Sequence, residues 1–125
     1  MQRSTHQRRV IRRVLVQADR PLSPSELLAA ARALAPSIGQ ATIYRNLKAL
    51  SEEGWLEVVD LPGEPSRYEV AGKGHHHHFV CRSCDGVFEV GGCPGDLRPL
   101  TPPGFQLEGH DLVLYGLCPA CPPAG

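Results

Sequence analysis

Two cysteine pairs with the same spacing indicate metal chemistry in the second half of the chain. Cys81 and Cys84 form one Cys-x2-Cys pair, and Cys118 and Cys121 form the other. Thiolate sulfur is a preferred ligand of zinc, and four thiolates arranged in two such pairs are typical of a closed tetrahedral site. We therefore predict a structural zinc ion at these four cysteines, which would contribute on the order of 10 kcal/mol to folding.

Four consecutive histidines, residues 75–78, lead directly into the first cysteine pair. Their internal position argues against an expression tag. If they lie on an extended strand, alternate side chains point to opposite faces, so His76 and His78 share one face and His75 and His77 the other. The four imidazoles could then serve two different metal sites.

The fifth cysteine, Cys93, lies outside both pairs. It could be a metal ligand, a redox-reactive thiol or a small buried apolar side chain. The sequence favours the buried apolar role slightly.

The first half of the chain predicts three helices, over residues 5–18, 24–35 and 39–53. Apolar residues recur at helical spacing in the first and third, and Ser23 followed by Glu26 predicts a capping box for the second. Three short helices indicate a helix-turn-helix, whose third helix enters the major groove of DNA. The alternative is a three-helix domain that contacts proteins. The candidate DNA-binding residues are Arg8, Arg9 and Arg12 for phosphates, and Gln40, Thr42, Tyr44, Arg45 and Lys48 on the third helix.

Two β-like runs over residues 55–60 and 66–70 follow the third helix, and the turn 61–65 joins them as the wing of a winged helix. Residues 1–70 are therefore predicted to form a DNA-binding domain, residues 71–74 a small-residue hinge, and residues 75–125 a metal-binding domain. Within the last we expect strands over 75–80, 87–90, 104–108 and 110–116, with a turn or short helix over 96–100. The predicted fold class is α+β.

Charge differs between the two halves although the chain is neutral overall. Residues 1–54 carry nine Lys and Arg against four acids, a net of +5, and residues 55–125 carry the opposite, −5. A basic half beside an acidic one fits one surface for nucleic acid and another for cations. With no apolar run that could span a membrane and no secretory signal, we expect a cytoplasmic protein with no membrane partner, in which metal thiolates are favoured over disulfides.

These motifs together resemble the ferric uptake regulator superfamily of bacterial metal-sensing repressors. The resemblance is carried by the motifs Thr5-x2-Arg8, Gly39–Leu47 (GQATIYRNL), His75–His78 with the first cysteine pair, and His110-x4-Tyr115-Gly116-x with the second. It implies an N-terminal winged helix, a C-terminal α/β dimerisation domain, a homodimer, and repression of metal-uptake genes through double-stranded operator DNA.

The resemblance also implies ligand sets. The four paired cysteines match the structural zinc site. Glu69, His76 and His78, with Glu89 as a further carboxylate, match a regulatory site at the hinge for a second divalent ion, Zn²⁺, Fe²⁺ or Mn²⁺. An additional site within the dimerisation domain is matched by His75, His77, Asp96 and His110.

The sequence departs from the family pattern in several places. Pro21 stands where iron-sensing and peroxide-sensing members often supply a histidine, and Val70 stands where zinc-sensing members often use a cysteine. Glu57 and Asp60 are candidate replacements in the wing. Cys93-Pro94 resembles some zinc uptake regulators, and the compact segment 85–104 argues against a long dimer-interface helix.

The expected function is a non-enzymatic, metal-responsive repressor with zinc favoured as corepressor. Iron or manganese sensing and Fe(II)-dependent peroxide sensing are alternatives. A zinc-storage protein and a zinc hydrolase are rivals of another class. The hydrolase is disfavoured because no His-x-Glu motif accompanies a downstream Cys-x2-Cys pair.

Overall fold

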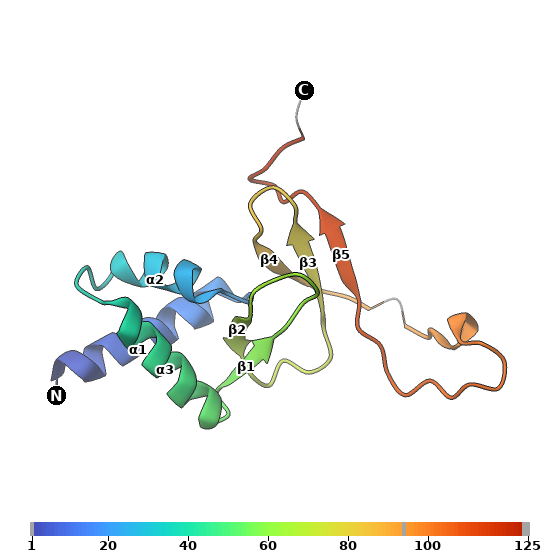
Figure 1. Cartoon of the computed structure of the whole chain (residues 1–125), viewed down its shortest axis with the longest axis horizontal. Helices are drawn as coiled ribbons and strands as arrows, with labels where there is room; N and C mark the ends of the chain where they lie inside the picture. Colours follow the sequence, from blue (N-terminus) through green and yellow to red (C-terminus); the bar gives the residue numbers. More distant parts are fainter. Residues whose placement is uncertain (1, 94, 124–125) are drawn as a thin grey trace. The chain divides into compact units, whose positions relative to one another are not determined.

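The computed structural model describes residues 2–93 and 95–123 and divides the chain into two units, Met1–Lys73 and Gly74–Gly125. Figure 1 shows three helices in the first unit and a small sheet in the second. The predicted α+β class is confirmed. None of the helices in the described ranges has the length and apolar character needed to cross a membrane.

Three helices form the first unit: α1 (Gln2–Ala18), α2 (Pro24–Arg32) and α3 (Gln40–Glu52). Their apolar faces meet in one cluster of buried side chains, including Ile11, Leu27 and Leu47. The helical spacing of these residues in the sequence is what brings them together, because positions three or four apart share a face. The predicted helix positions are confirmed, except that α2 ends at Arg32, three residues before the predicted end.

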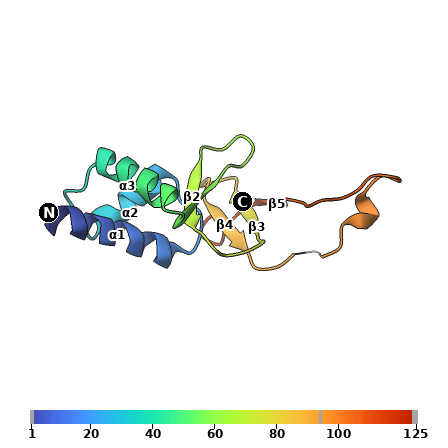
Figure 2. The same cartoon turned by 90° about the horizontal axis from the view of Figure 1, so that it is seen from below.

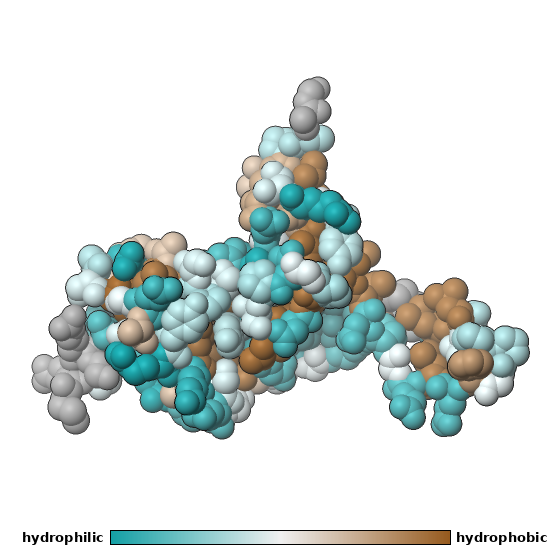
Figure 3. All heavy atoms as spheres, in the orientation of Figure 1, coloured by the Kyte–Doolittle hydropathy of each residue, from teal (hydrophilic) through white to brown (hydrophobic). Residues whose placement is uncertain are grey.

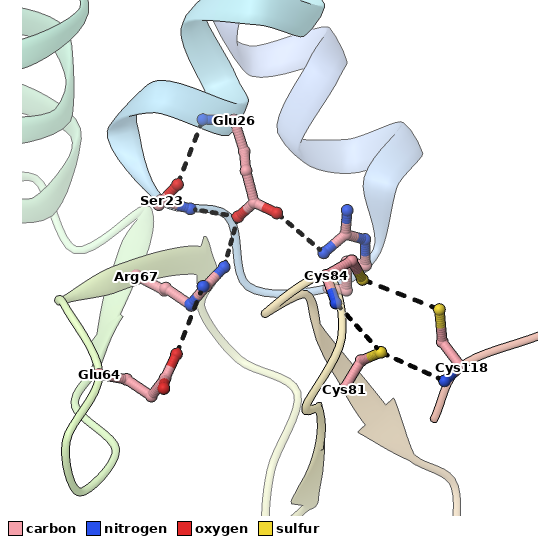
Figure 4. A network of polar contacts seen from close by, with 8 residues as sticks. Ser23, Glu26, Glu64, Arg67, Cys81, Cys84 and Cys118 are labelled. Atoms are coloured by element: carbon pink, nitrogen blue, oxygen red, sulfur yellow. Dashed lines mark hydrogen bonds and ion pairs between the residues drawn. The ribbon is translucent and has the colours of Figure 1, made fainter. Parts of the chain in front are cut away.

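The start of α2 is fixed by a capping box and by a buried arginine (Figure 4). The Ser23 hydroxyl accepts a hydrogen bond from the Glu26 amide at 3.2 Å, and the Glu26 carboxylate accepts one from the Ser23 amide at 2.9 Å. The same carboxylate pairs with Arg67, whose side chain is 5% exposed. Glu64 lies 3.6 Å from Arg67 on the other side. These bonds tie the wing to the second helix.

The wing is an antiparallel hairpin of β1 (Leu56–Val59) and β2 (Arg67–Val70). Leu22 adds an antiparallel bridge to Tyr68, with both backbone hydrogen bonds at 2.9 Å. The connection between α1 and α2 is thereby attached to the wing, and the first unit has the architecture of a winged helix.

The second unit contains a three-stranded sheet in the order β4–β3–β5. The central strand β3 (His77–Cys81) pairs antiparallel with β4 (Val87–Val90) and parallel with β5 (Val113–Gly116). Gly116 is required at its position, because an added Cβ would come within 2.9 Å of the Phe79 ring. His75 and His76 precede the strand that the sequence predicted to begin at residue 75.

Residues 95–109 lead away from the sheet and carry the 3-10 helix η1 (Arg98–Leu100), as Figure 2 shows. Apolar side chains gather on this projection in Figure 3, and Leu100 and Phe105 are 79% and 71% exposed. The strand predicted over residues 104–108 is wrong. The alternation of apolar and polar residues there is not enough, because no neighbouring strand among the described residues supplies hydrogen-bond partners.

Candidate metal centres and a candidate DNA-binding surface

The sulfur atoms of Cys81, Cys84, Cys118 and Cys121 lie within 4.8 Å of one another, and we call this group the four-cysteine cluster. Each pair occupies a tight turn: the Asp85 amide donates to the Cys81 carbonyl, and the Cys121 amide to the Cys118 carbonyl, both at 2.9 Å. The first pair joins the end of β3 to β4, and the second follows β5. The sheet therefore brings together two pairs that 33 residues separate in the sequence.

Distances within the four-cysteine cluster fit zinc (Figure 4). The sulfurs of Cys84 and Cys118 are 3.8 Å apart. A tetrahedral zinc ion with Zn–S bonds of about 2.3 Å requires sulfur–sulfur distances of about 3.8 Å. The Cys81 sulfur also accepts hydrogen bonds from the amides of Cys84 at 3.5 Å and Cys118 at 3.4 Å. These bonds would stabilise a thiolate ligand from outside the metal shell.

The acidity of the thiols differs across the four-cysteine cluster. Amide hydrogen bonds from Cys84 and Cys118 lower the pKa of Cys81 to about 6. A hydrogen bond with Ser83 lowers the pKa of Cys121, but contact with Cys118 and burial outweigh it and raise that pKa to about 12. One thiolate forms readily and suppresses ionisation of its neighbours, because like charges repel. A divalent cation between the sulfurs removes that repulsion.

A second group of ligands forms where β3 begins. His75, His77, Cys93 and His110 each offer one ligand atom within 4.8 Å of the others, and we call this group the histidine–cysteine cluster. The Nε2 atom of His110 lies 3.2 Å from the Nε2 atoms of both His75 and His77. The sequence-predicted histidines therefore do converge on one point.

The fourth predicted ligand of this site does not join the group. The Asp96 carboxylate instead accepts hydrogen bonds from the Arg98 side chain at 2.8 and 3.0 Å and from the Arg98 amide at 3.0 Å. Cys93 takes the fourth position in its place. The expectation that Cys93 is buried is wrong, since its side chain is exposed. No local signal in the sequence distinguishes Cys93 from Asp96 as the residue that reaches the three histidines.

His77 is the buried member of the histidine–cysteine cluster, with 1% of its surface exposed. Burial, and then the positive charges of His75 and His110, lower its pKa. The ring is therefore neutral at neutral pH, as a metal ligand must be. Its Nδ1 accepts a hydrogen bond from the Leu112 amide at 3.2 Å. A metal at Nε2 would move the ring proton to Nδ1 and break this bond, which costs about 1 kcal/mol against roughly 10 for zinc binding.

The other two histidines lie together on the opposite side. The rings of His76 and His78 are 4.8 Å apart, as expected for alternate residues of an extended segment. Nδ1 of His76 donates to the Gly74 carbonyl at 2.8 Å, which leaves its Nε2 for a ligand role. Glu89 on β4 pairs in register with His78 and shares its face of the sheet. The predicted ligand Glu69 belongs to the first unit, where it is buried and lies 3.8 Å from the Lys73 ammonium.

The candidate DNA-binding residues on α3 form an exposed row. Gln40, Tyr44, Arg45 and Lys48 are exposed, and Thr42 is half-buried. Ile43, Leu47 and Leu50 on the other face anchor the helix in the core. The helix thus presents polar side chains to solvent along its length, as a recognition helix must.

On α1, Thr5, Arg8, Arg9 and Arg12 line a surface hollow of about 210 Å³. Arg8 forms an ion pair with Glu53, and the Arg12 guanidinium lies 4.8 Å from the centre of the Trp55 ring. Both contacts join α1 to the end of α3 and the start of the wing. They orient Arg8 and Arg12, whereas Arg9 is exposed.

Comparison with known proteins identifies the family. Residues 2–115 match the model of the ferric uptake regulator family. The chain belongs to the ferric uptake regulator family. It is 30% identical over 122 residues to the ferric uptake regulation protein of Campylobacter jejuni, which covers 94% of this chain and 78% of that protein.

Two solved structures extend the comparison. A zinc-bound manganese uptake regulator is 30% identical, with a TM-score of 0.77 over 90% of this chain and 87% of its own. FurB of Mycobacterium tuberculosis, a zinc uptake regulator, is 31% identical, with a TM-score of 0.54 over 96% and 95%. This ferric uptake regulator family member is thus a metal-responsive transcription regulator rather than an enzyme.

Proposed function

We propose that the chain is a homodimeric repressor that binds the operators of metal-uptake genes when zinc fills its regulatory site. The observation that carries the proposal is that one chain combines an exposed polar face on α3 with several groups of metal ligands. Family membership supports operator binding by a dimer. The four-cysteine cluster would hold a structural zinc ion, because a closed tetrahedral site leaves no position for exchange with substrate.

The regulatory ligands proposed are Glu69, His76, His78 and Glu89. Glu69 belongs to the wing strand β2, and the other three belong to the second unit. The connecting residues include Gly72 and Gly74, both with positive φ, a backbone conformation that other residues rarely adopt. A metal bound by ligands from both units would favour one arrangement of the wings over others, and occupancy would thereby change DNA affinity.

Zinc is preferred as the sensed metal for two reasons, of which the first is that Cys93-Pro94 resembles some zinc uptake regulators and the second concerns Pro21. Pro21 replaces the histidine that iron-sensing relatives often supply, and this proline is fully buried and cannot bind a metal. Imidazole and carboxylate ligands by themselves also accept Fe(II) and Mn(II). The choice therefore needs a direct comparison of the three metals.

The test is DNA-binding anisotropy at fixed salt, with protein that holds one zinc ion per chain and a fragment carrying its own promoter region. Zn(II), Mn(II) and anaerobic Fe(II) are titrated separately. Zinc is expected to raise DNA affinity by roughly 5- to 150-fold, the usual range for allosteric coupling.

Two variants and one control locate the coupling. Glu69→Ala and His76→Ala are expected to lose most of the zinc response, whereas Glu108→Ala, at an exposed position outside the ligand groups, should retain it. Unchanged metal dependence in both variants would rule out this ligand set. Strong DNA binding with no response to any metal would rule out metal-dependent repression. Loss of metal-activated binding after peroxide would favour peroxide sensing.

A further inference from the structure

The histidine–cysteine cluster has the dimensions of a tetrahedral site in which one ligand is sulfur. The Cys93 sulfur lies 3.3 Å from Nε2 of His77, 3.3 Å from Nε2 of His110 and 3.7 Å from Nε2 of His75. A zinc ion with Zn–N bonds of about 2.05 Å and a Zn–S bond of about 2.3 Å requires nitrogen–sulfur distances of about 3.6 Å and nitrogen–nitrogen distances of about 3.3 Å. The Nε2 atom of His110 lies 3.2 Å from each of the other two Nε2 atoms.

Three separate segments supply these four ligands. His75 directly precedes β3 and His77 begins it, whereas Cys93 follows β4 and His110 precedes β5. Nε2 is the converging atom in all three rings, and the ring of His77 is held by burial, with 1% of its surface exposed. Four ligand atoms from three segments therefore converge within 4.8 Å of one another.

We propose that Cys93 is a thiolate ligand in a three-histidine, one-cysteine site, and that this sulfur makes the site selective for Zn(II) over Mn(II) and Fe(II). Thiolate is a soft ligand that suits zinc and cobalt, whereas Mn(II) prefers oxygen ligands and higher coordination numbers. Family resemblance places the Asp96 carboxylate in this position, and an oxygen ligand would discriminate less. The inference rests on the geometry of this cluster and does not require that the chain binds DNA.

A metal ion in this site would also link the two ends of the projecting segment that carries η1. Cys93 and His110 flank residues 94–109, which include η1 and the exposed Leu100 and Phe105. A metal bound to both ends would shorten the span that the projection can explore, as any cross-link does for a flexible loop. Hydrogen exchange at the amide of Asp111, next to the ligand His110, should therefore slow when the site is filled.

The experiment uses cobalt as a spectroscopic probe. Full-length protein receives one equivalent of zinc for the four-cysteine cluster, and Co(II) is then added without oxygen. Wild-type protein should show the strong visible bands of tetrahedral cobalt and a sulfur-to-cobalt charge-transfer band in the near ultraviolet. The proposed regulatory ligands contain no sulfur, so cobalt bound there gives no charge-transfer band.

Cys93→Ser and Cys93→Asp are the test variants, and Asp96→Asn is the matched control. Both cysteine variants should lose the charge-transfer band of the second cobalt ion, while Asp96→Asn keeps it. The four-cysteine cluster is intact in all of them, so any band that it contributes remains. Circular dichroism compares folding, and Cys93→Asp provides a second replacement if the serine variant folds poorly.

Competition with a chelator then measures metal preference. Zinc affinity of this site should fall at least tenfold in Cys93→Ser, and the ratio of zinc to manganese affinity should fall in Cys93→Asp. An unchanged charge-transfer band and unchanged zinc affinity in Cys93→Ser would overturn the proposal. Loss of the second cobalt ion in Asp96→Asn, with retention in Cys93→Ser, would assign the fourth ligand to Asp96 instead.

Discussion

The two units are stabilised in different ways. The first unit encloses a continuous cluster of thirteen buried apolar side chains from three helices, their connections and the wing. In the second unit, the buried residues among those described are His77, Val80, Cys81, Gly86, Val87 and Cys118. Half of them are candidate metal ligands. A unit of this size buries too little apolar surface to be stable without further support, and metal–ligand bonds are a common source of it.

Removal of the structural metal should therefore have the largest effect, and should be confined to the second unit. We expect Cys118→Ser to remove most of the zinc contribution, on the order of 10 kcal/mol, and to unfold the sheet. The buried Cys118 sulfur is a vertex of the four-cysteine cluster and its amide is bonded to Cys81. Residue-resolved hydrogen exchange would show protection lost in β3, β4 and β5 and retained in α1 and α3.

Cys93→Ser is the control for this change, because it also removes one thiol from the second unit. It should leave protection of β3 and β5 near the four-cysteine cluster largely intact. Equal loss of protection in α3 after Cys118→Ser would contradict the contrast between the two units.

A cavity in the first unit should have a smaller effect, independent of metal. Leu47 is 2% exposed at the centre of the apolar cluster. We expect Leu47→Ala to lower the free energy of unfolding of the first unit by about 2–5 kcal/mol, because it loses apolar contacts and leaves a cavity. Urea denaturation followed by the fluorescence of Trp55, the single tryptophan, would measure the change.

The matched control is Val16→Ala on α1, where the side chain is 55% exposed. It should change the free energy of unfolding by no more than about 0.5 kcal/mol. The cobalt spectrum of the second unit should be the same in both variants. A spectrum altered by Leu47→Ala would show that the stabilities of the two units are linked.

Much of the fold could be predicted from the sequence because the signals are local. Helical spacing of apolar residues located α1 and α3, and the Ser23–Glu26 pair located the start of α2. Ligand spacing located the four-cysteine cluster, because a Cys-x2-Cys turn places both sulfurs on one side of the chain. Alternation along a strand also predicted that His76 and His78 would lie on the same side.

The predictions that failed depend on distant neighbours. Residues 104–108 alternate like a strand but lie in the projection, where they meet no partner strand. The fourth position of the histidine–cysteine cluster depends on where the chain turns after β4. Cys93 lies before that departure, whereas Asp96 lies beyond it and pairs with Arg98. Local pattern carried no information about which of the two would reach the histidines.

The smallest predicted effect concerns the N-cap of α2 and its contribution to the stability of the first unit. The Ser23 hydroxyl caps α2. The Glu26 carboxylate accepts a hydrogen bond from the Ser23 amide and also forms an ion pair with Arg67. We expect Ser23→Ala to cost about 1 kcal/mol of the free energy of unfolding, the usual value for loss of an N-cap. Ser37→Ala, at an exposed turn, is the control and should be nearly neutral. A cost near zero at Ser23 would mean that the Glu26–Arg67 pair alone fixes the start of α2, and Glu26→Gln would then cause the larger loss.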